Sequence, residues 1–65
     1  MSPLPARELE FLRWISAGKR DSEIAQLMQV SVSTVRLYAW RVKNKLGAST
    51  NAGLVATAIR RGLIT

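Results

Sequence analysis

The chain contains neither cysteine nor histidine among its 65 residues, and this absence limits the ways in which it can fold. A domain of this size buries only about 60% of its unfolded surface, so many are stabilised by disulfides or a bound metal. Without thiols and imidazoles we expect no disulfide, no metal site and no other cofactor. The fold must therefore come from closely packed helices, with association between chains as a further source of stability.

The spacing of the apolar residues predicts an all-α fold of four helices. Pro5 suits the start of the first helix, because a helix does not use the N–H group that proline lacks at that point. Asp21 is the expected N-cap of the second helix, and a glycine follows each of the other three. The expected helices cover residues 6–17, 22–29, 33–46 and 51–61.

Each predicted helix has one apolar face that can contribute to a shared core. Glu8 falls on the inward side of the first helix, and we expect a neighbouring N–H group or arginine to hold its carboxylate. Leu63 and Ile64 are expected to fold back onto the core. The expected core residues in the helices are Phe11, Leu12, Ile15, Ile24, Ala25, Leu27, Met28, Val35, Tyr38, Ala39, Val42, Leu46, Leu54, Val55, Ala58 and Ile59.

Residues 30–32 separate the second and third helices by the length of a tight helix-turn-helix corner. We therefore expect one domain over residues 1–65, with the helix-turn-helix at about 21–46 and a last helix at about 51–61. The sequence has no apolar run that could span a membrane and no signal peptide, so the cytoplasm is the expected compartment.

The net positive charge is confined to the second half of the chain. Residues 1–30 contain four basic and four acidic residues, whereas residues 31–65 contain six basic residues and no acidic one. Such a one-sided field suits a polyanion, either nucleic acid or an anionic membrane surface. The membrane is disfavoured because the third helix needs its apolar stripe for the core. An enzyme is not expected, because the candidate catalytic groups are few.

The predicted helix over 33–46 carries a basic and aromatic face opposite its apolar stripe. Arg36, Trp40 and Lys43 share that face, and such a helix fits the major groove of B-DNA, which is about 12 Å wide. Base contacts are expected from Arg36, whose guanidinium can bind guanine O6 and N7, and from Leu37 and Trp40 through thymine methyl groups. Phosphate contacts are expected from Ser33, Thr34, Arg41, Lys43, Asn44 and Lys45.

The outward side of the last predicted helix consists of Gly53, Ala56, Thr57 and Arg60. The first three of these residues are small, so two such helices can approach each other closely. We therefore expect a weak symmetric homodimer in which both chains use this surface.

Together these features resemble the LuxR-type, or GerE-type, helix-turn-helix domain of bacterial transcription regulators. The resemblance extends from Leu4 to Ile64 without a gap. It implies a four-helix domain whose third helix enters the major groove, with contacts at Arg36, Leu37, Trp40 and Lys43, and whose fourth helix dimerises. It rests on Ala6-Arg7-Glu8-Leu9-Glu10-Phe11-Leu12, Glu23-Ile24-Ala25, Ser31-Val32-Ser33-Thr34-Val35, Lys45-Leu46-Gly47 and Gly62-Leu63-Ile64.

The chain departs from this family pattern on the groove face itself. Leu37, Ala39 and Trp40 stand where many members have polar residues, Tyr38 where many have histidine, and Arg20 where many have a serine or threonine cap. This unusually apolar face leaves two functions open. One is sequence-specific binding of double-stranded DNA by a nucleoid-associated transcription regulator. The other is a protein-binding module that pairs with another regulator or with RNA polymerase.

Overall fold

The computed structural model describes residues 4–64, and its four helices confirm the predicted all-α fold. The helices are α1 (Ala6–Ser16), α2 (Asp21–Met28), α3 (Val32–Leu46) and α4 (Asn51–Arg60). This part of the chain contains no strand, and none of its helices is long and apolar enough to cross a membrane.

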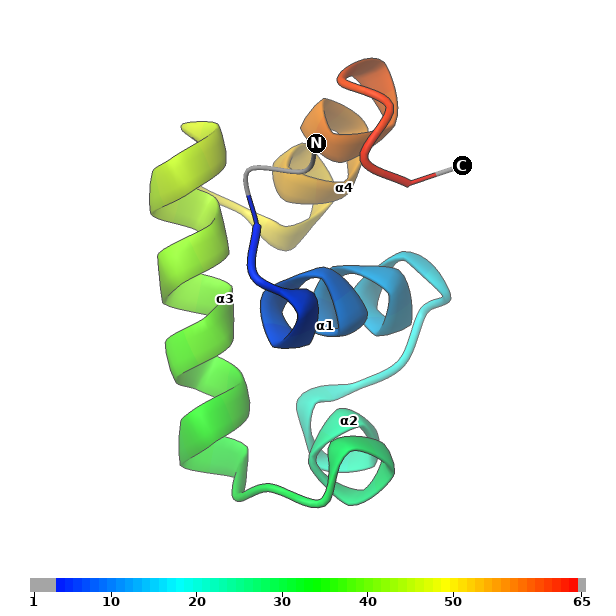
Figure 1. The fold of residues 1–65 in the computed structure, drawn as a ribbon, viewed down its shortest axis with the longest axis vertical. Coiled ribbons are helices and arrows are strands. Elements are labelled where there is room, and N and C mark those ends of the chain that lie inside the picture. The colour runs from blue at the N-terminus through cyan, green and yellow to red at the C-terminus, as the bar shows by residue number, and fades with distance from the viewer. Residues whose placement is uncertain (1–3, 65) are drawn as a thin grey trace.

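The longest helix, α3, forms one side of the molecule and contacts each of the other three helices (Figure 1). α1 crosses the middle of α3, while α2 lies near the start of α3 and α4 near its end. No contact between α2 and α4 occurs within residues 4–64. The side of α3 that faces away from the other helices is therefore left open.

The core lies where α1, α2 and α4 meet the inner side of α3. Phe11, Leu12, Val35, Val42 and Leu54 are fully buried there. Leu63 and Ile64 fold back as predicted, because the N–H group of Leu63 donates to the carbonyl of Ala58 at 2.9 Å and Ile64 is buried. The other buried hydrophobic residues are Leu4, Ile24, Ala25, Met28, Leu46 and Ala58.

Two predicted core residues are exposed, and for both the prediction was wrong. Leu27 is 47% exposed on α2, and Ile59 is 52% exposed on α4. Leu27 points about 100° away from the buried Met28, and Ile59 about 100° away from the buried Ala58, so each lies at the edge of the apolar face of its helix. α2 and α4 sit at opposite ends of α3, so no fourth helix covers that edge.

The start of α2 also differs from the prediction. The N-cap is Arg20 rather than Asp21, and Asp21 is the first residue of the helix. The backbone N–H group of Arg20 donates to Glu23 Oε1 at 2.9 Å, so Glu23 closes the first turn from within the helix. Asp21 stands in the first turn, where the helix dipole favours a negative charge.

The start of α3 is capped by a hydroxyl group. Ser31 Oγ accepts a hydrogen bond from the backbone N–H group of Thr34 at 3.1 Å, and the helix begins at Val32, one residue before the predicted start. At its other end Gly47 has φ 71°, a left-handed conformation that glycine adopts without strain and that ends the helix.

Two polar contacts tie α1 to the helix-turn-helix. Lys45 Nζ lies 2.7 Å from Glu8 Oε1, so the partner of the buried carboxylate is a lysine on α3 rather than an arginine or N–H group. The preceding residue of α1 makes the second contact: Arg7 Nη2 donates to the carbonyl oxygen of Met28 at 2.7 Å, which satisfies the last carbonyl of α2. α1 therefore fixes the end of α2 and the end of α3 together.

Replacement of Lys45 by methionine should destabilise the fold more than replacement of Glu8 by glutamine. The Glu8 side chain is 5% exposed and the Lys45 side chain 40% exposed, so Lys45→Met leaves a buried carboxylate unpaired. The free energy of unfolding should fall by about 1–3 kcal/mol, measured by urea denaturation. Glu8→Gln leaves a lysine that can still reach water and should cost less. An equal or larger loss in Glu8→Gln would contradict this account of the pair.

Candidate nucleic-acid interface

The open side of α3 carries a large exposed aromatic residue among basic and polar ones. Trp40 is 63% exposed and Leu37 is 43% exposed, and Arg36 and Arg41 also lie at the surface. Burial of Val35, Val42 and Leu46 on the inner side of the helix fixes this orientation. The structure thus brings Arg36, Leu37 and Trp40 onto one accessible surface, as the sequence predicted.

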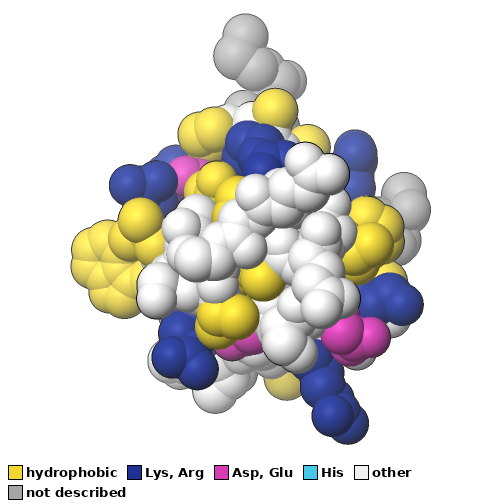
Figure 2. All heavy atoms as spheres, turned by 90° about the horizontal axis from the view of Figure 1, so that it is seen from below, with side chains coloured by type: hydrophobic (Ala, Val, Ile, Leu, Met, Phe, Trp, Pro, Cys, Tyr) yellow, Lys and Arg dark blue, Asp and Glu magenta, His cyan; other side chains and the backbone are white. Residues whose placement is uncertain are grey.

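At one end of the molecule the basic side chains do not form one continuous patch. Figure 2 shows the end of the molecule formed by α2 and the start of α3, where basic side chains are spread around the rim with hydrophobic and polar groups between them. The surface therefore combines dispersed positive charge with apolar area, and a ligand on it would make contacts of both kinds.

At the start of α3, one predicted phosphate-contact residue is already part of the cap. The hydroxyl groups of Ser31 and Thr34 are 2.9 Å apart, in addition to the bond from the Thr34 N–H group to Ser31 Oγ. Ser33 is exposed between them. Thr34 therefore holds the first turn of α3, and Ser33 is the more accessible hydroxyl.

Near the end of α3, two further predicted contact residues have partners within the chain. Asn44 Nδ2 donates to the backbone carbonyl of Trp40 at 2.7 Å, and Lys45 Nζ binds Glu8. Each nitrogen retains further N–H donors, because an amide has two and an ammonium three. Both side chains are thus oriented by the fold while keeping donors for another acceptor.

A shallow hollow lies along one flank of α3, between the start of α2 and the start of α4. Its lining includes Trp40 and Lys43 of α3 together with Asn51 at the start of α4. Asp21 and Arg36 also line it, with 3.9 Å between Asp21 Oδ2 and Arg36 Nε. Asp21 was not predicted to belong to this surface, because spacing along the chain does not reveal contacts between two helices.

Only part of the predicted dimer surface on α4 is exposed. Ala56 and Arg60 are exposed, whereas Gly53 and Thr57 are half-buried. The Gly53 N–H group donates to Thr50 Oγ1 at 3.0 Å, and a Cβ atom on Gly53 would lie 3.1 Å from that oxygen. The small size of Gly53 therefore serves the N-cap of α4.

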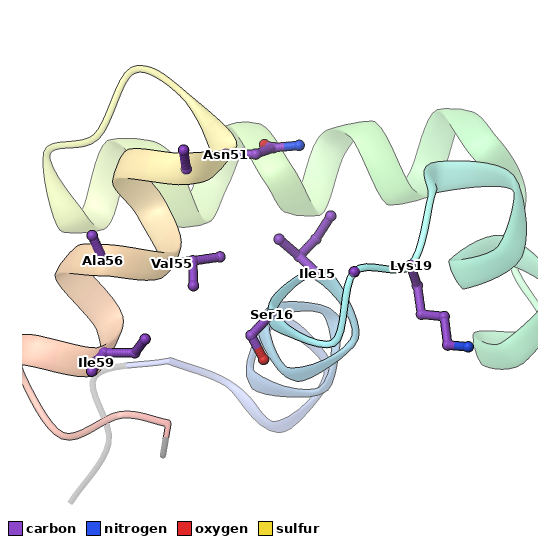
Figure 3. A pocket seen from close by; sticks show the side chains of 9 residues that line it. Ile15, Ser16, Lys19, Asn51, Val55, Ala56 and Ile59 are labelled. Atoms are coloured by element: carbon purple, nitrogen blue, oxygen red, sulfur yellow. The ribbon is translucent and has the colours of Figure 1, made fainter.

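An apolar groove runs beside Ala56, between α4 and the end of α1 (Figure 3). Val55 and Ile15 face each other across it, and Ala56 and the exposed Ile59 continue it along α4. Lys19 stands at its edge. This groove was not predicted, because the sequence analysis assigned Ile15, Val55 and Ile59 wholly to the core.

Comparison with protein families gives a match over most of the chain. The model described as bacterial regulatory proteins of the luxR family, GerE, matches residues 2–58. VjbR from Brucella ovis, a quorum sensing-dependent transcriptional regulator with a helix-turn-helix, is 41% identical over 63 residues. That alignment covers 97% of this chain but 24% of VjbR, so the chain spans about a quarter of the length of this relative.

Solved structures show the same arrangement of helices. The response regulator ChrA of a heme-sensing two-component system superposes with a TM-score of 0.93 and 26% identity, over 98% of this chain and 32% of ChrA. VqmA from Vibrio cholerae, solved in a complex with ligand and DNA, superposes with a TM-score of 0.89 and 35% identity, over 97% of this chain and 28% of VqmA. A structure of the VqmA dimer without target DNA gives a TM-score of 0.91.

Proposed function

Because the chain belongs to the luxR family of bacterial regulatory proteins, we propose that it binds double-stranded DNA sequence-specifically and regulates transcription. The observation that carries this proposal is the open face of α3, where Arg36 and the exposed Trp40 lie together on a helix braced by α2. The similar structure of VqmA in a complex with DNA supports it. The proposal includes a cytoplasmic, nucleoid-associated location, since the duplex target is chromosomal.

In the proposed complex the outer face of α3 lies in the major groove. Arg36 binds a guanine, and Leu37 and Trp40 contact thymine methyl groups. Ser33, Arg41 and Lys43 contact phosphates through their hydroxyl, guanidinium and ammonium groups. Thr34, Asn44 and Lys45 contact phosphates through the donors that their internal hydrogen bonds leave over.

A protein-binding module is the less favoured function. VjbR is named a transcriptional regulator and VqmA is solved with DNA, so the relatives favour a duplex as the partner of this domain. A protein partner seated on Leu37 and Trp40 would occupy the same surface as the proposed duplex. A measurement of whether a duplex binds at that surface therefore distinguishes the two functions.

The affinity for duplex DNA should fall steeply with salt. Six basic residues and no acidic one lie in residues 31–65, so we expect contact with about four to six phosphates. A plot of log K against log salt concentration should have a slope of about −4 to −5, measured by titration of random-sequence duplex pools. A slope near zero, or no binding at low salt, would contradict the DNA-binding function.

Arg36 and Lys43 should affect binding in different ways. Arg36→Ala should cost about 1–3 kcal/mol of binding free energy and relax the preference at one base pair. Lys43→Ala should weaken binding to all sequences about equally and reduce the salt slope by about one unit. Selection of duplexes from a random pool by each variant measures both effects. Loss of affinity in Arg36→Ala without a change of preference would mean that Arg36 contacts only phosphate.

We also propose that two copies of the domain pair weakly through α4. The exposed Ala56 allows close approach, and the neighbouring groove offers apolar area to a two-fold-related copy of the same helix. The VqmA dimer supports this association. Since the contact is small, DNA with two half-sites about one turn apart should favour the pair.

Ala56→Glu should abolish cooperative binding of two domains to one palindromic duplex, because it places a charge in the proposed contact. Ala6→Glu is the matched control, since Ala6 is also exposed and does not line the groove. Sedimentation of each protein with the duplex measures the stoichiometry. Two-to-one cooperative binding that survives in Ala56→Glu would show that α4 is not the dimer surface.

A further inference from the structure

We propose that Asp21 is a positioning residue that determines specificity by orienting Arg36 toward a base. The inference rests on the proposed DNA-binding function, in which Arg36 binds guanine. Asp21, at the start of α2, would then contribute to base recognition indirectly, through the side chain of Arg36 on α3.

The geometry of the contact selects one nitrogen of the guanidinium. Asp21 Oδ2, at the start of α2, lies 3.9 Å from Arg36 Nε on α3. The Asp21 side chain is 39% exposed and the Arg36 side chain 74% exposed, so the arginine extends outward from a more enclosed carboxylate. The carboxylate therefore lies beside Nε, the guanidinium nitrogen that is bonded to the aliphatic part of the side chain.

This direction of approach leaves the base-binding edge free. Arginine has five N–H donors, one on Nε and two on each terminal nitrogen. Guanine O6 and N7 accept two of them from one edge of the plane. A carboxylate near Nε limits rotation of the guanidinium, so fewer orientations compete with the one that binds the base. Because exposed ion pairs contribute little to stability, the effect should appear in binding rather than folding.

The charge of Asp21 acts on affinity in the opposite direction. Non-specific binding to DNA depends on phosphate neutralisation, and a carboxylate beside Arg36 and Lys43 opposes it for every sequence. Asp21 therefore lowers the affinity for random duplexes while it favours the correct base. The other three acids have different partners: Glu8 pairs with Lys45, Glu10 with Arg7, and Glu23 with the N–H group of Arg20.

The test compares Asp21→Ala and Asp21→Asn with the unaltered 65-residue chain. The probes are a random-sequence duplex pool, the duplex selected from it, and the selected duplex altered at the base pair that Arg36→Ala no longer distinguishes. Both variants should bind the random pool about 3–10-fold more tightly. Asp21→Ala should lose about 5–10-fold of its discrimination at that base pair, and Asp21→Asn less, since the partial negative charge of its amide oxygen still attracts the guanidinium.

Two further measurements distinguish orientation of Arg36 by Asp21 from electrostatic repulsion between Asp21 and the DNA. In an Arg36→Ala background, Asp21→Ala should cause no additional loss of discrimination, because the two residues act as a pair. Glu10→Gln removes the same charge at a distance from this hollow and should leave discrimination unchanged. Tighter binding of all duplexes with unaltered discrimination in both Asp21 variants would overturn the proposal.

A different result is expected if the proposed DNA-binding function itself is wrong. If the unaltered chain binds no duplex, or if Arg36→Ala keeps the original preference, the proposed base contact is wrong, and the inference about Asp21 is overturned with it. If Arg36→Ala relaxes the preference but Asp21→Asn and Asp21→Ala do not, only the inference about Asp21 is overturned. Thermal unfolding of both variants checks that each one is folded at the binding temperature.

Discussion

The buried stripe of α3, formed by Val35, Val42 and Leu46, is the contact on which the other helices depend. α1, α2 and α4 all pack against α3, while α2 and α4 do not meet within residues 4–64. Loss of the stripe would therefore remove the contacts that α3 makes with all three other helices. Because one side of α3 is committed to three neighbours, its opposite side is left open, and the same packing that stabilises a small core presents Arg36 and Trp40 to a ligand.

The contacts of α1 determine how accurately that surface is held. Its Arg7 satisfies the last carbonyl of α2, and its Glu8 binds Lys45 in the last turn of α3. The angle between α2 and α3 is thus fixed at three points, namely these two contacts and the corner at residues 30–32. The 3.9 Å approach of Asp21 to Arg36 depends on that angle, since the two residues come from different helices.

The sequence predicts which way a side chain faces around its helix axis better than it predicts which residues of other helices that side chain contacts. Periodicity identified the four helices and the inward stripe of α3 correctly, because both depend on local spacing. Leu27 and Ile59 were assigned to the core because they border an apolar face, but the short helices α2 and α4 have no partner at that border. The partner of Glu8 and the placement of Asp21 were missed for the same reason, since each depends on which helix lies opposite.

The composition of the open face indicates how affinity and specificity are divided. A carboxylate lies beside Arg36, and Leu37 and Trp40 add exposed apolar area to the basic side chains of α3. Apolar contacts to bases do not release counterions, so they add affinity that salt does not remove. A single domain with few phosphate contacts would bind weakly, and recognition of a long site would require two copies. The groove beside Ala56 lies between α4 and the end of α1 and contains no residue of α3, so pairing there would leave the start of α3 accessible in both copies.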